Sequence, residues 1–107
     1  MSEINLPFKP AMQEAILAGK KSCTSRYKRY GNPGDTFEMF GQRFILTSVI
    51  GMIGLGVVAN QLFREEGFDT PEAFWETWRK LHPRRTGFGK NDDKVWVHRF
   101  RKLEVQG

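Results

Sequence analysis

The chain has 107 residues, about the size of one ordinary domain, so we expect a single domain over residues 1–107 whose site is built from one core and its loops. Apolar residues make up 39% of the sequence, with nine Phe and three Trp, which excludes a disordered chain. Lys and Arg outnumber Asp and Glu by 17 to 12, and the net charge of +5 favours anionic partners without proving one.

The single cysteine, Cys23, excludes an internal disulfide and leaves no cluster with the spacing of a zinc site. No apolar run approaches the roughly 20 residues needed to span a bilayer. Polar residues near the N-terminus also break the apolar stretch that a signal peptide needs, among them Asn5, Lys9 and Glu14. We therefore expect a cytoplasmic protein with no membrane contact, no metal and no cofactor.

The first third of the chain predicts a strand, a helix and a second strand. Ile4, Leu6 and Phe8 alternate as in a short strand. A helix then begins near Pro10 and ends at Gly19, the residue suited to a left-handed helix end. Residues 22–27 are compatible with a strand, and they lead into a loop that ends at residue 35.

The middle of the chain predicts a hairpin followed by a helix. Residues 36–40 and 43–53 form its two strands, joined by a turn at Gly41 and Gln42. Three glycines indicate a bulge or bend at the end of the second strand, or alternatively a flexible loop: Gly51, Gly54 and Gly56. A short helix over 57–64 follows and is closed by Gly67.

The last third predicts a helix, a loop and a closing strand. Thr70 is a good N-cap before Pro71, and the helix that it begins ends at Pro83. A basic, glycine-containing loop follows and is a candidate binding loop. Residues 94–103 alternate as a final strand. This order of elements favours a mixed α/β or α+β barrel over a layered parallel sheet.

A motif at the first helix-to-strand junction resembles that of a known family. The stretch GKKSCTSR, residues 19–26, is similar to the GxKxxxxR signature of ASCH domains. The resemblance continues through PGD at 33–35, EGF at 66–68, the helix with two tryptophans and the terminal VWVHRF, so it covers nearly the whole chain. It implies an α+β fold, the PUA-like (ASCH) small mixed β-barrel with flanking helices.

The family resemblance also implies a function. ASCH domains are associated with RNA binding and RNA-linked regulation, and some small single-domain members hydrolyse N4-acylated cytidine nucleosides. Those members use a lysine, a threonine and a glutamate, and Lys21, Thr24 and Glu66 match these places, with Glu65 as the alternative carboxylate. The implied activity is an amidohydrolase acting on N4-acylcytidine-type nucleosides, with Thr24 as nucleophile, Lys21 as general base and Glu66 as proton relay.

Local geometry sets a condition on this assignment. Residues three apart on a regular strand face opposite sides, so Lys21 and Thr24 meet only if the backbone turns between them or the lysine side chain curls round. A simple ion pair is the structural alternative for Glu66. The other residues predicted to line the substrate site are Lys20, Arg26, Glu65, Phe68 and His98.

Two of these lining residues have structural alternatives. Arg26 could instead bind a phosphate, cap a carboxylate or form an ion pair with Asp35. His98 shares one face of the last strand with Trp96 and Phe100, which is also the position of a histidine whose hydrogen bonds are satisfied in the core or at the barrel mouth.

A different class of function remains open, in which the domain binds RNA without cleaving it or acts as a ribonuclease. Positive charge combined with rings is typical of single-strand binders. The structural alternative is that these charged loop residues simply face solvent and bind no RNA. The residues that carry this pattern are Lys28, Arg29 and Tyr30 together with Arg84, Arg85, Phe88 and Lys90.

Overall fold

The computed structural model describes residues 2–82 and 93–104. Within them the elements are α1 (Pro10–Leu17), β1 (Cys23–Arg26), β2 (Thr36–Met39), β3 (Gln42–Gly54), α2 (Leu55–Gln61), α3 (Pro71–Leu81) and β4 (Lys94–Lys102). No helix in this part of the chain is long and apolar enough to cross a membrane. The α+β class, one of the two that the order of elements favoured and the one that the resemblance implied, is confirmed.

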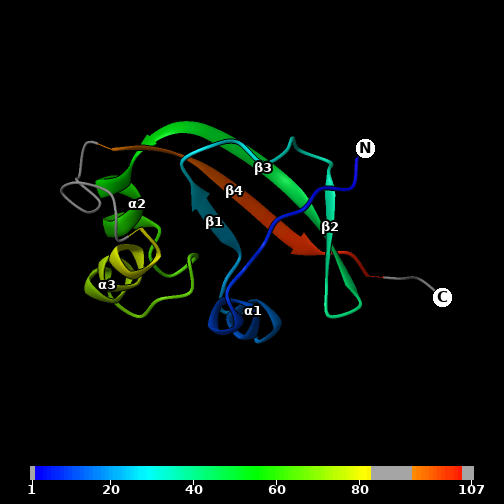
Figure 1. Ribbon diagram of the computed structural model, residues 1–107, viewed down its shortest axis with the longest axis horizontal. Coiled ribbons are helices and arrows are strands. Elements are labelled where there is room, and N and C mark those ends of the chain that lie inside the picture. Colours follow the sequence, from blue (N-terminus) through cyan, green and yellow to red (C-terminus); the bar gives the residue numbers. More distant parts are fainter. Residues whose placement is uncertain (1, 83–92, 105–107) are drawn as a thin grey trace.

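The described strands form one antiparallel sheet in the order β1-β4-β3-β2. Figure 1 shows the two long central strands, β3 and β4, curving across the molecule, with α2 and α3 at one end and the β2–β3 hairpin at the other. The pairing of β3 with β4 shifts register between Leu46 and Ser48 and between Ile50 and Ile53. Such shifts bend a strand, so the sheet curls into a half-barrel, and the predicted bulge near Gly51 is confirmed.

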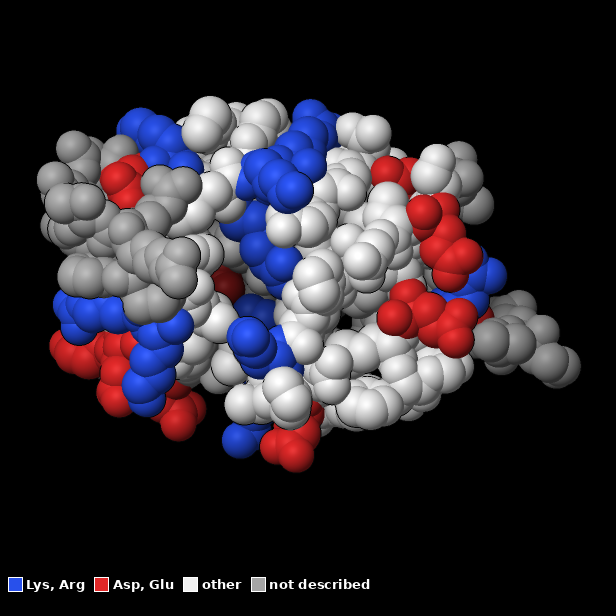
Figure 2. All heavy atoms as spheres, in the orientation of Figure 1, with Lys and Arg blue, Asp and Glu red and all other residues white. Residues whose placement is uncertain are grey.

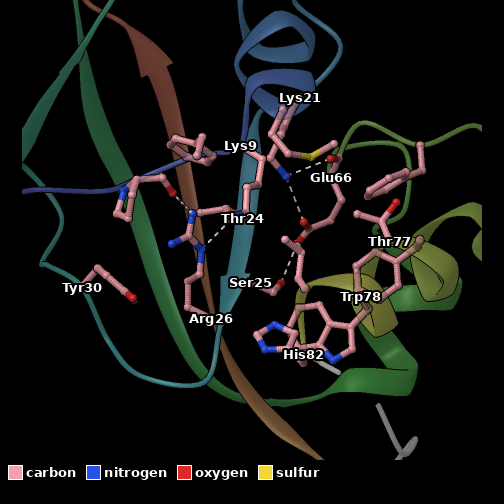
Figure 3. Close-up of a pocket in the computed structure, with 16 residues that line it drawn as sticks. Lys9, Lys21, Thr24, Ser25, Arg26, Tyr30, Glu66, Thr77, Trp78 and His82 are labelled. Carbon is pink, nitrogen blue, oxygen red and sulfur yellow. Dashed lines mark hydrogen bonds and ion pairs between the residues drawn. The ribbon is translucent and has the colours of Figure 1, made fainter. Parts of the chain in front are cut away.

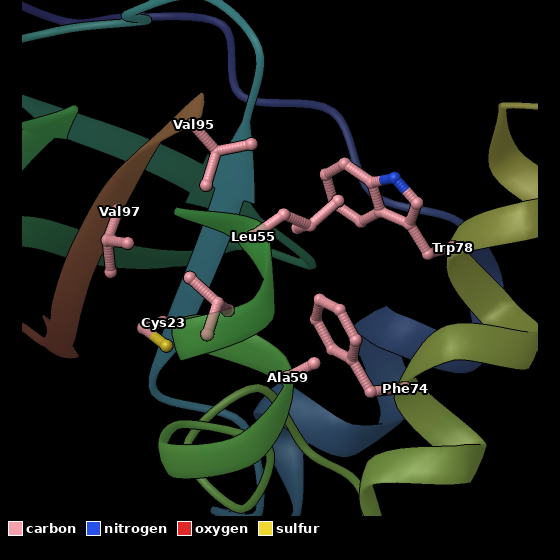
Figure 4. Packing of buried hydrophobic residues seen from close by; sticks show 8 residues of the cluster. Cys23, Leu55, Ala59, Phe74, Trp78, Val95 and Val97 are labelled. Carbon is pink, nitrogen blue, oxygen red and sulfur yellow. The ribbon is translucent and has the colours of Figure 1, made fainter. Parts of the chain in front are cut away.

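Two apolar clusters pack against this curled sheet. In the first, Phe74 and Trp78 of α3 pack with Leu55 and Ala59 of α2 against Val97 of β4 (Figure 4).

The second cluster lies around the β2–β3 hairpin and includes Phe37, Phe44 and Phe100, with Leu6 and Ile16 from the N-terminal segment and α1. The aromatic rings of its phenylalanines are 5.3 to 6.1 Å apart between centroids, within the range of favourable aromatic pairs.

The N-terminal strand predicted over residues 4–8 is absent from the described structure. The only pairing there is an isolated bridge between Glu3 and Thr36. Leu6 is buried in the second cluster, and Ile4 and Phe8 pack against it from the same segment. Their spacing therefore reflects side-chain packing of an extended segment rather than a ladder of backbone hydrogen bonds.

The α2 helix begins earlier than the sequence indicated. It spans Leu55–Gln61 rather than 57–64, with Gly54 as its N-cap and Gly56 buried inside it. Residues 63–67 form turns instead. Two smaller differences are the hairpin turn, which lies at residues 40–41, and β1, which is confined to Cys23–Arg26.

The α3 helix agrees with the sequence prediction. The Thr70 hydroxyl accepts a hydrogen bond from the Ala73 N–H at 3.1 Å, which satisfies one of the free donors of the first turn. The predicted binding loop at 84–93 lies almost entirely outside the described residues, as does Pro83.

Candidate functional site

A pocket of about 420 Å³ lies between the N-terminal segment, β1, the turn at residues 66–68 and α3 (Figure 3). It borders both apolar clusters, because Phe74 and Trp78 belong to the first cluster and Phe8 and Tyr30 pack against the second. The volume is in the range of small-molecule sites. The described residues that line it are Pro7, Phe8, Lys9, Met12, Lys21, Thr24, Ser25, Arg26, Tyr30, Glu66, Phe68, Phe74, Thr77, Trp78, Leu81 and His82.

A buried ion pair lies in this pocket. The Lys21 Nζ is 3.1 Å from Glu66 Oε1, and the two side chains are only 3% and 5% exposed. The same ammonium donates to the backbone carbonyl of Glu66 at 2.9 Å. A lysine ammonium has three N–H donors, so these two contacts leave one for a further group in the pocket.

Lys21 and Glu66 meet because the segment after α2 docks on the start of β1. The carbonyl of Glu65 accepts hydrogen bonds from the N–H groups of Ser22 and Cys23, at 2.8 and 3.1 Å. Gly67 follows with a φ of +101°, a conformation that favours glycine, and a Cβ there would be 3.1 Å from the Lys21 Cβ. This turn therefore brings Glu66 against Lys21 across 45 residues of sequence.

Lys21 lies outside β1, so the alternation of a regular strand does not set its direction relative to Thr24. Gly19 has a φ of +77°, and the N–H groups of Lys20 and Lys21 both donate to the carbonyl of Ala15. Lys21 thus still belongs to the closing turn of α1, while Thr24 lies in β1. Both side chains line the pocket, where Figure 3 shows Thr24 joined to Arg26 and Lys21 joined to Glu66.

Ser25 joins this group and was missed by the sequence analysis. Its Oγ donates to Glu66 Oε2 at 2.6 Å, and both side chains are buried. Glu66 therefore binds Lys21 through one carboxylate oxygen and Ser25 through the other. Strand alternation assigns Ser25 to the face opposite Thr24, so no signal in the sequence pointed to it.

Thr24 lies beside a fixed arginine. The Arg26 Nε donates to the Thr24 Oγ1 at 3.1 Å, and its Nη2 donates to the Pro7 carbonyl at 2.6 Å. The guanidinium carbon is 5.1 Å from the ring centroids of both Phe8 and Tyr30. Burial lowers the pKa of Arg26, and the Tyr30 hydroxyl opposes that shift. Arginine nevertheless stays charged in proteins, so the pocket holds a permanent cation.

The ion pair between Arg26 and Asp35 that we considered does not form. The Asp35 carboxylate accepts the N–H groups of Ser2 and Asn32, at 3.0 and 2.8 Å. These hydrogen bonds lower the pKa of Asp35 and satisfy its oxygens away from the pocket.

Of the residues predicted to line the substrate site, Arg26 and Phe68 do so, whereas Lys20, Glu65 and His98 do not. Lys20 is exposed after the end of α1. Glu65 forms a half-exposed ion pair with Arg99 at 3.4 Å. Between the two alternative carboxylates, the pocket therefore contains Glu66 and not Glu65.

His98 lies outside the pocket lining and contacts two of the residues that form it, Tyr30 and Thr24. It is fully buried, and its Nε2 accepts the Tyr30 N–H at 3.0 Å. The neutral ring then carries its proton on Nδ1, which is 3.3 Å from the Thr24 carbonyl. Burial lowers the pKa of His98, the Thr24 carbonyl opposes that shift, and the positive charge of Arg26 adds to it. His98 thus ties the loop at residue 30 to β1.

The remaining lining residues come mainly from one face of α3 and its end. Phe74, Thr77, Trp78 and Leu81 are spaced by three or four residues, so they share one side of the helix. Trp78 is buried in the first apolar cluster, yet it also borders the pocket. The helical spacing would have revealed this wall if the position of the pocket had been known.

Cys23 is a buried core residue rather than a nucleophile. It is 0% exposed and packs in the first cluster, and burial raises the pKa of its thiol. Over residues 2–82 and 93–104, no three His, Cys, Asp or Glu side chains come together in a way that could hold a metal ion.

Positively charged side chains lie on the face that Figure 2 shows. Figure 2 shows Lys and Arg side chains in a band across the middle of this face, beside a hollow. Lys28 and Arg29, two of the residues considered for RNA, lie over the rings of Tyr30 and Trp96 at 5.2 Å each. Arg84, Arg85, Phe88 and Lys90 lie outside the described residues.

Comparison with known proteins gives structural neighbours only. No family model matches the sequence, and no curated protein matches it either. The hypothetical protein PH0355 is similar in structure, with a TM-score of 0.65 and 17% identity over 95% of this chain and 98% of that one. The ASCH domain from Lactobacillus crispatus JV V101 has a TM-score of 0.62 and 17% identity over 94% of this chain and 78% of its own.

A third neighbour is the protein EF3133 from Enterococcus faecalis V583, assigned to the family DUF984. Its TM-score is 0.62, with 12% identity over 95% of this chain and 75% of that one. Identities this low establish a shared fold and not a shared activity.

Proposed function

Because the chain has the ASCH-type, PUA-like fold, we propose that it hydrolyses the acyl amide of N4-acylcytidine-type nucleosides in the pocket beside β1. The observation that carries this proposal is the convergence of Lys21, Thr24 and Glu66 in one sheltered pocket. Amide cleavage needs a nucleophile, a proton acceptor and a proton donor for the leaving amine, and these side chains supply all three.

The ion pair can supply both the base and the acid. A proton that moves from Lys21 to Glu66 along their 3.1 Å contact leaves an amine next to a carboxylic acid. The amine then takes the proton of Thr24 as its Oγ1 attacks the acyl carbonyl carbon.

The first half-reaction ends with the acyl group on Thr24. The new C–O bond forms as the carbonyl becomes an oxyanion, and collapse of this intermediate breaks the C–N4 bond. The departing N4 takes the proton held by Glu66, which releases cytidine. The Arg26 N–H beside Oγ1, at 3.1 Å, stabilises negative charge that develops next to it.

Water completes the cycle. It gives a proton to the Glu66 carboxylate and attacks the acyl carbon, the C–Oγ1 bond breaks, and Oγ1 recovers a proton from the Lys21 ammonium. The released acid loses its proton to solvent, and the ion pair re-forms. The apolar wall of α3, with Phe74, Trp78 and Leu81, offers a surface for the pyrimidine ring.

The assay is release of cytidine from N4-acetylcytidine, followed by chromatography. We expect Lys21→Met and Glu66→Gln to lose the activity, while their sequence neighbours Lys20→Met and Glu65→Gln retain it. Turnover that survives in Lys21→Met would overturn the assignment of the base.

A second pair of variants tests the nucleophile. Thr24→Ala should abolish release of cytidine, whereas Ser25→Ala should slow it, because Ser25 holds Glu66 at 2.6 Å. The opposite pattern, activity in Thr24→Ala and none in Ser25→Ala, would assign the nucleophile to Ser25.

The rival function is a module that binds RNA without cleaving it, or a ribonuclease, and the basic band in Figure 2 favours either. Binding to phosphates weakens steeply as salt rises, whereas turnover of an uncharged nucleoside does not. Salt-sensitive RNA binding that falls in Lys28→Ala and Arg29→Ala, with no cytidine released, would favour this rival. RNA fragments on a gel would identify a ribonuclease.

A further inference from the structure

The charges in the pocket do not balance. Its described lining contains three cations, Lys9, Lys21 and Arg26, and a single carboxylate, Glu66. Lys21 and Glu66 neutralise each other at 3.1 Å. Lys9 and Arg26 therefore face the pocket without a counter-charge in that lining.

Arg26 is held in place without being neutralised. Its hydrogen bonds go to the Thr24 hydroxyl and the Pro7 carbonyl, the Tyr30 hydroxyl is a further hydrogen-bond partner, and rings lie 5.1 Å from the guanidinium on Phe8 and Tyr30. Within the described residues it forms no ion pair with a carboxylate. A fixed guanidinium with N–H groups to spare is the preferred protein partner of a carboxylate or phosphate.

The position of Arg26 indicates which part of a substrate it meets. Its Nε is 3.1 Å from the Thr24 Oγ1, the atom that attacks the acyl carbonyl in the proposed reaction. An anion bound by this guanidinium therefore lies a few atoms from that carbonyl, on the acyl side. A phosphate on the ribose would lie on the far side of the cytosine ring.

We infer that the pocket selects acyl groups that end in a carboxylate, so that its substrates are half-amides of dicarboxylic acids, with Arg26 and Lys9 binding the free carboxylate. The inference rests on the proposed function for the position of the scissile carbonyl. Acetyl groups would then be accepted as short analogues that leave the cationic side of the pocket unused.

The kinetic test compares three substrates: N4-succinylcytidine, N4-acetylcytidine and N4-acetylcytidine 5′-monophosphate. We expect kcat/KM for the succinyl compound to exceed that for the acetyl compound by about tenfold or more, the effect of a charge-assisted hydrogen bond. The ratio of the two should fall toward one in Lys9→Gln and Arg26→Gln and stay at its wild-type value in Lys20→Gln. Equal kcat/KM for the succinyl and acetyl nucleosides would overturn the inference. So would a higher kcat/KM for the 5′-monophosphate than for the succinyl compound.

A binding test separates this inference from the proposed function. Calorimetry with succinamate, and with butyramide as its uncharged counterpart, needs no hydrolysis. We expect succinamate to bind about tenfold more tightly than butyramide in the wild type, with the difference lost in Arg26→Gln and reduced in Lys9→Gln. Because Lys9 is exposed, its variant should fold even if Arg26→Gln does not.

Together, the kinetic and binding tests show whether the proposed function or the carboxylate site is wrong. Succinamate binding that depends on Arg26, in a protein that hydrolyses no acylcytidine, would retain the carboxylate site and remove the proposed function. Release of cytidine from N4-acetylcytidine, combined with equal binding of succinamate and butyramide, would retain the proposed function and remove the carboxylate site.

Discussion

Glu66 holds the site together through both its side chain and its peptide group. It accepts Lys21 at Oε1 and at its backbone carbonyl, and Ser25 at Oε2. Glu66→Gln keeps the shape but leaves the Lys21 ammonium buried without its counter-charge, and we expect a loss of about 3–5 kcal/mol in the free energy of unfolding. Urea denaturation measures this change.

Glu65 provides the matched control for that experiment. Its ion pair with Arg99 is 3.4 Å long and its two side chains are 35% and 42% exposed, so solvent screens it. Glu65→Gln should therefore cost less than about 1 kcal/mol. Equal losses in the two variants would contradict the special role of the buried pair.

His98 should make stability depend on pH. Burial holds its pKa below the ordinary value of 6.5, so as the pH falls past that value the unfolded chain binds a proton before the folded one does. The free energy of unfolding should therefore decrease as pH falls from about 7 to 5. Urea titrations across that range should give a shallower decrease for His98→Gln, and an identical slope in both proteins would contradict this reading.

The catalytic candidates could be named from the sequence only because the motif resembles a known family. Residue spacing alone placed Lys21 and Thr24 on opposite faces, and the structure resolves this through the turn at Gly19. Ser25 was out of reach, since its partner Glu66 is 41 residues away. Contacts at that separation are set by how the segment after α2 docks on β1.

At the scale of the elements, the packing of β3 against the Trp96 ring of β4 depends on the absence of a side chain at Gly51. A Cβ there would lie 2.3 Å from the Trp96 ring of β4. Gly51→Ala should therefore cost about 1–3 kcal/mol by overpacking, measured as the free energy of unfolding. The same substitution in a Trp96→Val background should cost less, and an unchanged cost would show that the ring is not the cause.

Elements were predicted well where their ends carry local signals. α3 begins where Thr70 and Pro71 place it, because capping is decided by neighbouring residues. α2 was displaced by two residues at its start because Gly54 and Gly56 were interpreted as strand-bend signals, whereas Gly54 caps the helix and Gly56 lies inside it. The alternation at residues 4–8 was assigned to a strand, although side-chain packing in the second cluster explains it.

The pocket exists only at the scale of the whole molecule. Its walls come from the N-terminal segment, β1, the turn at residues 66–68 and α3, which Figure 1 shows converging at the side of the curled sheet. The PUA-like fold expected from the motif is confirmed, and this curl leaves room between the two apolar clusters. Sequence patterns fix neither the volume of that space nor its surplus of positive charge.

A trapped covalent intermediate tests the proposed reaction most directly. The protein is mixed with N4-acetylcytidine, quenched in acid within one turnover and analysed by peptide mass spectrometry. We predict one added acetyl group on the peptide that contains Thr24, assigned to that residue by fragmentation and absent from Thr24→Ala treated in the same way. Release of cytidine with no acetyl group on Thr24, or with the acetyl group on Ser25, would contradict the account.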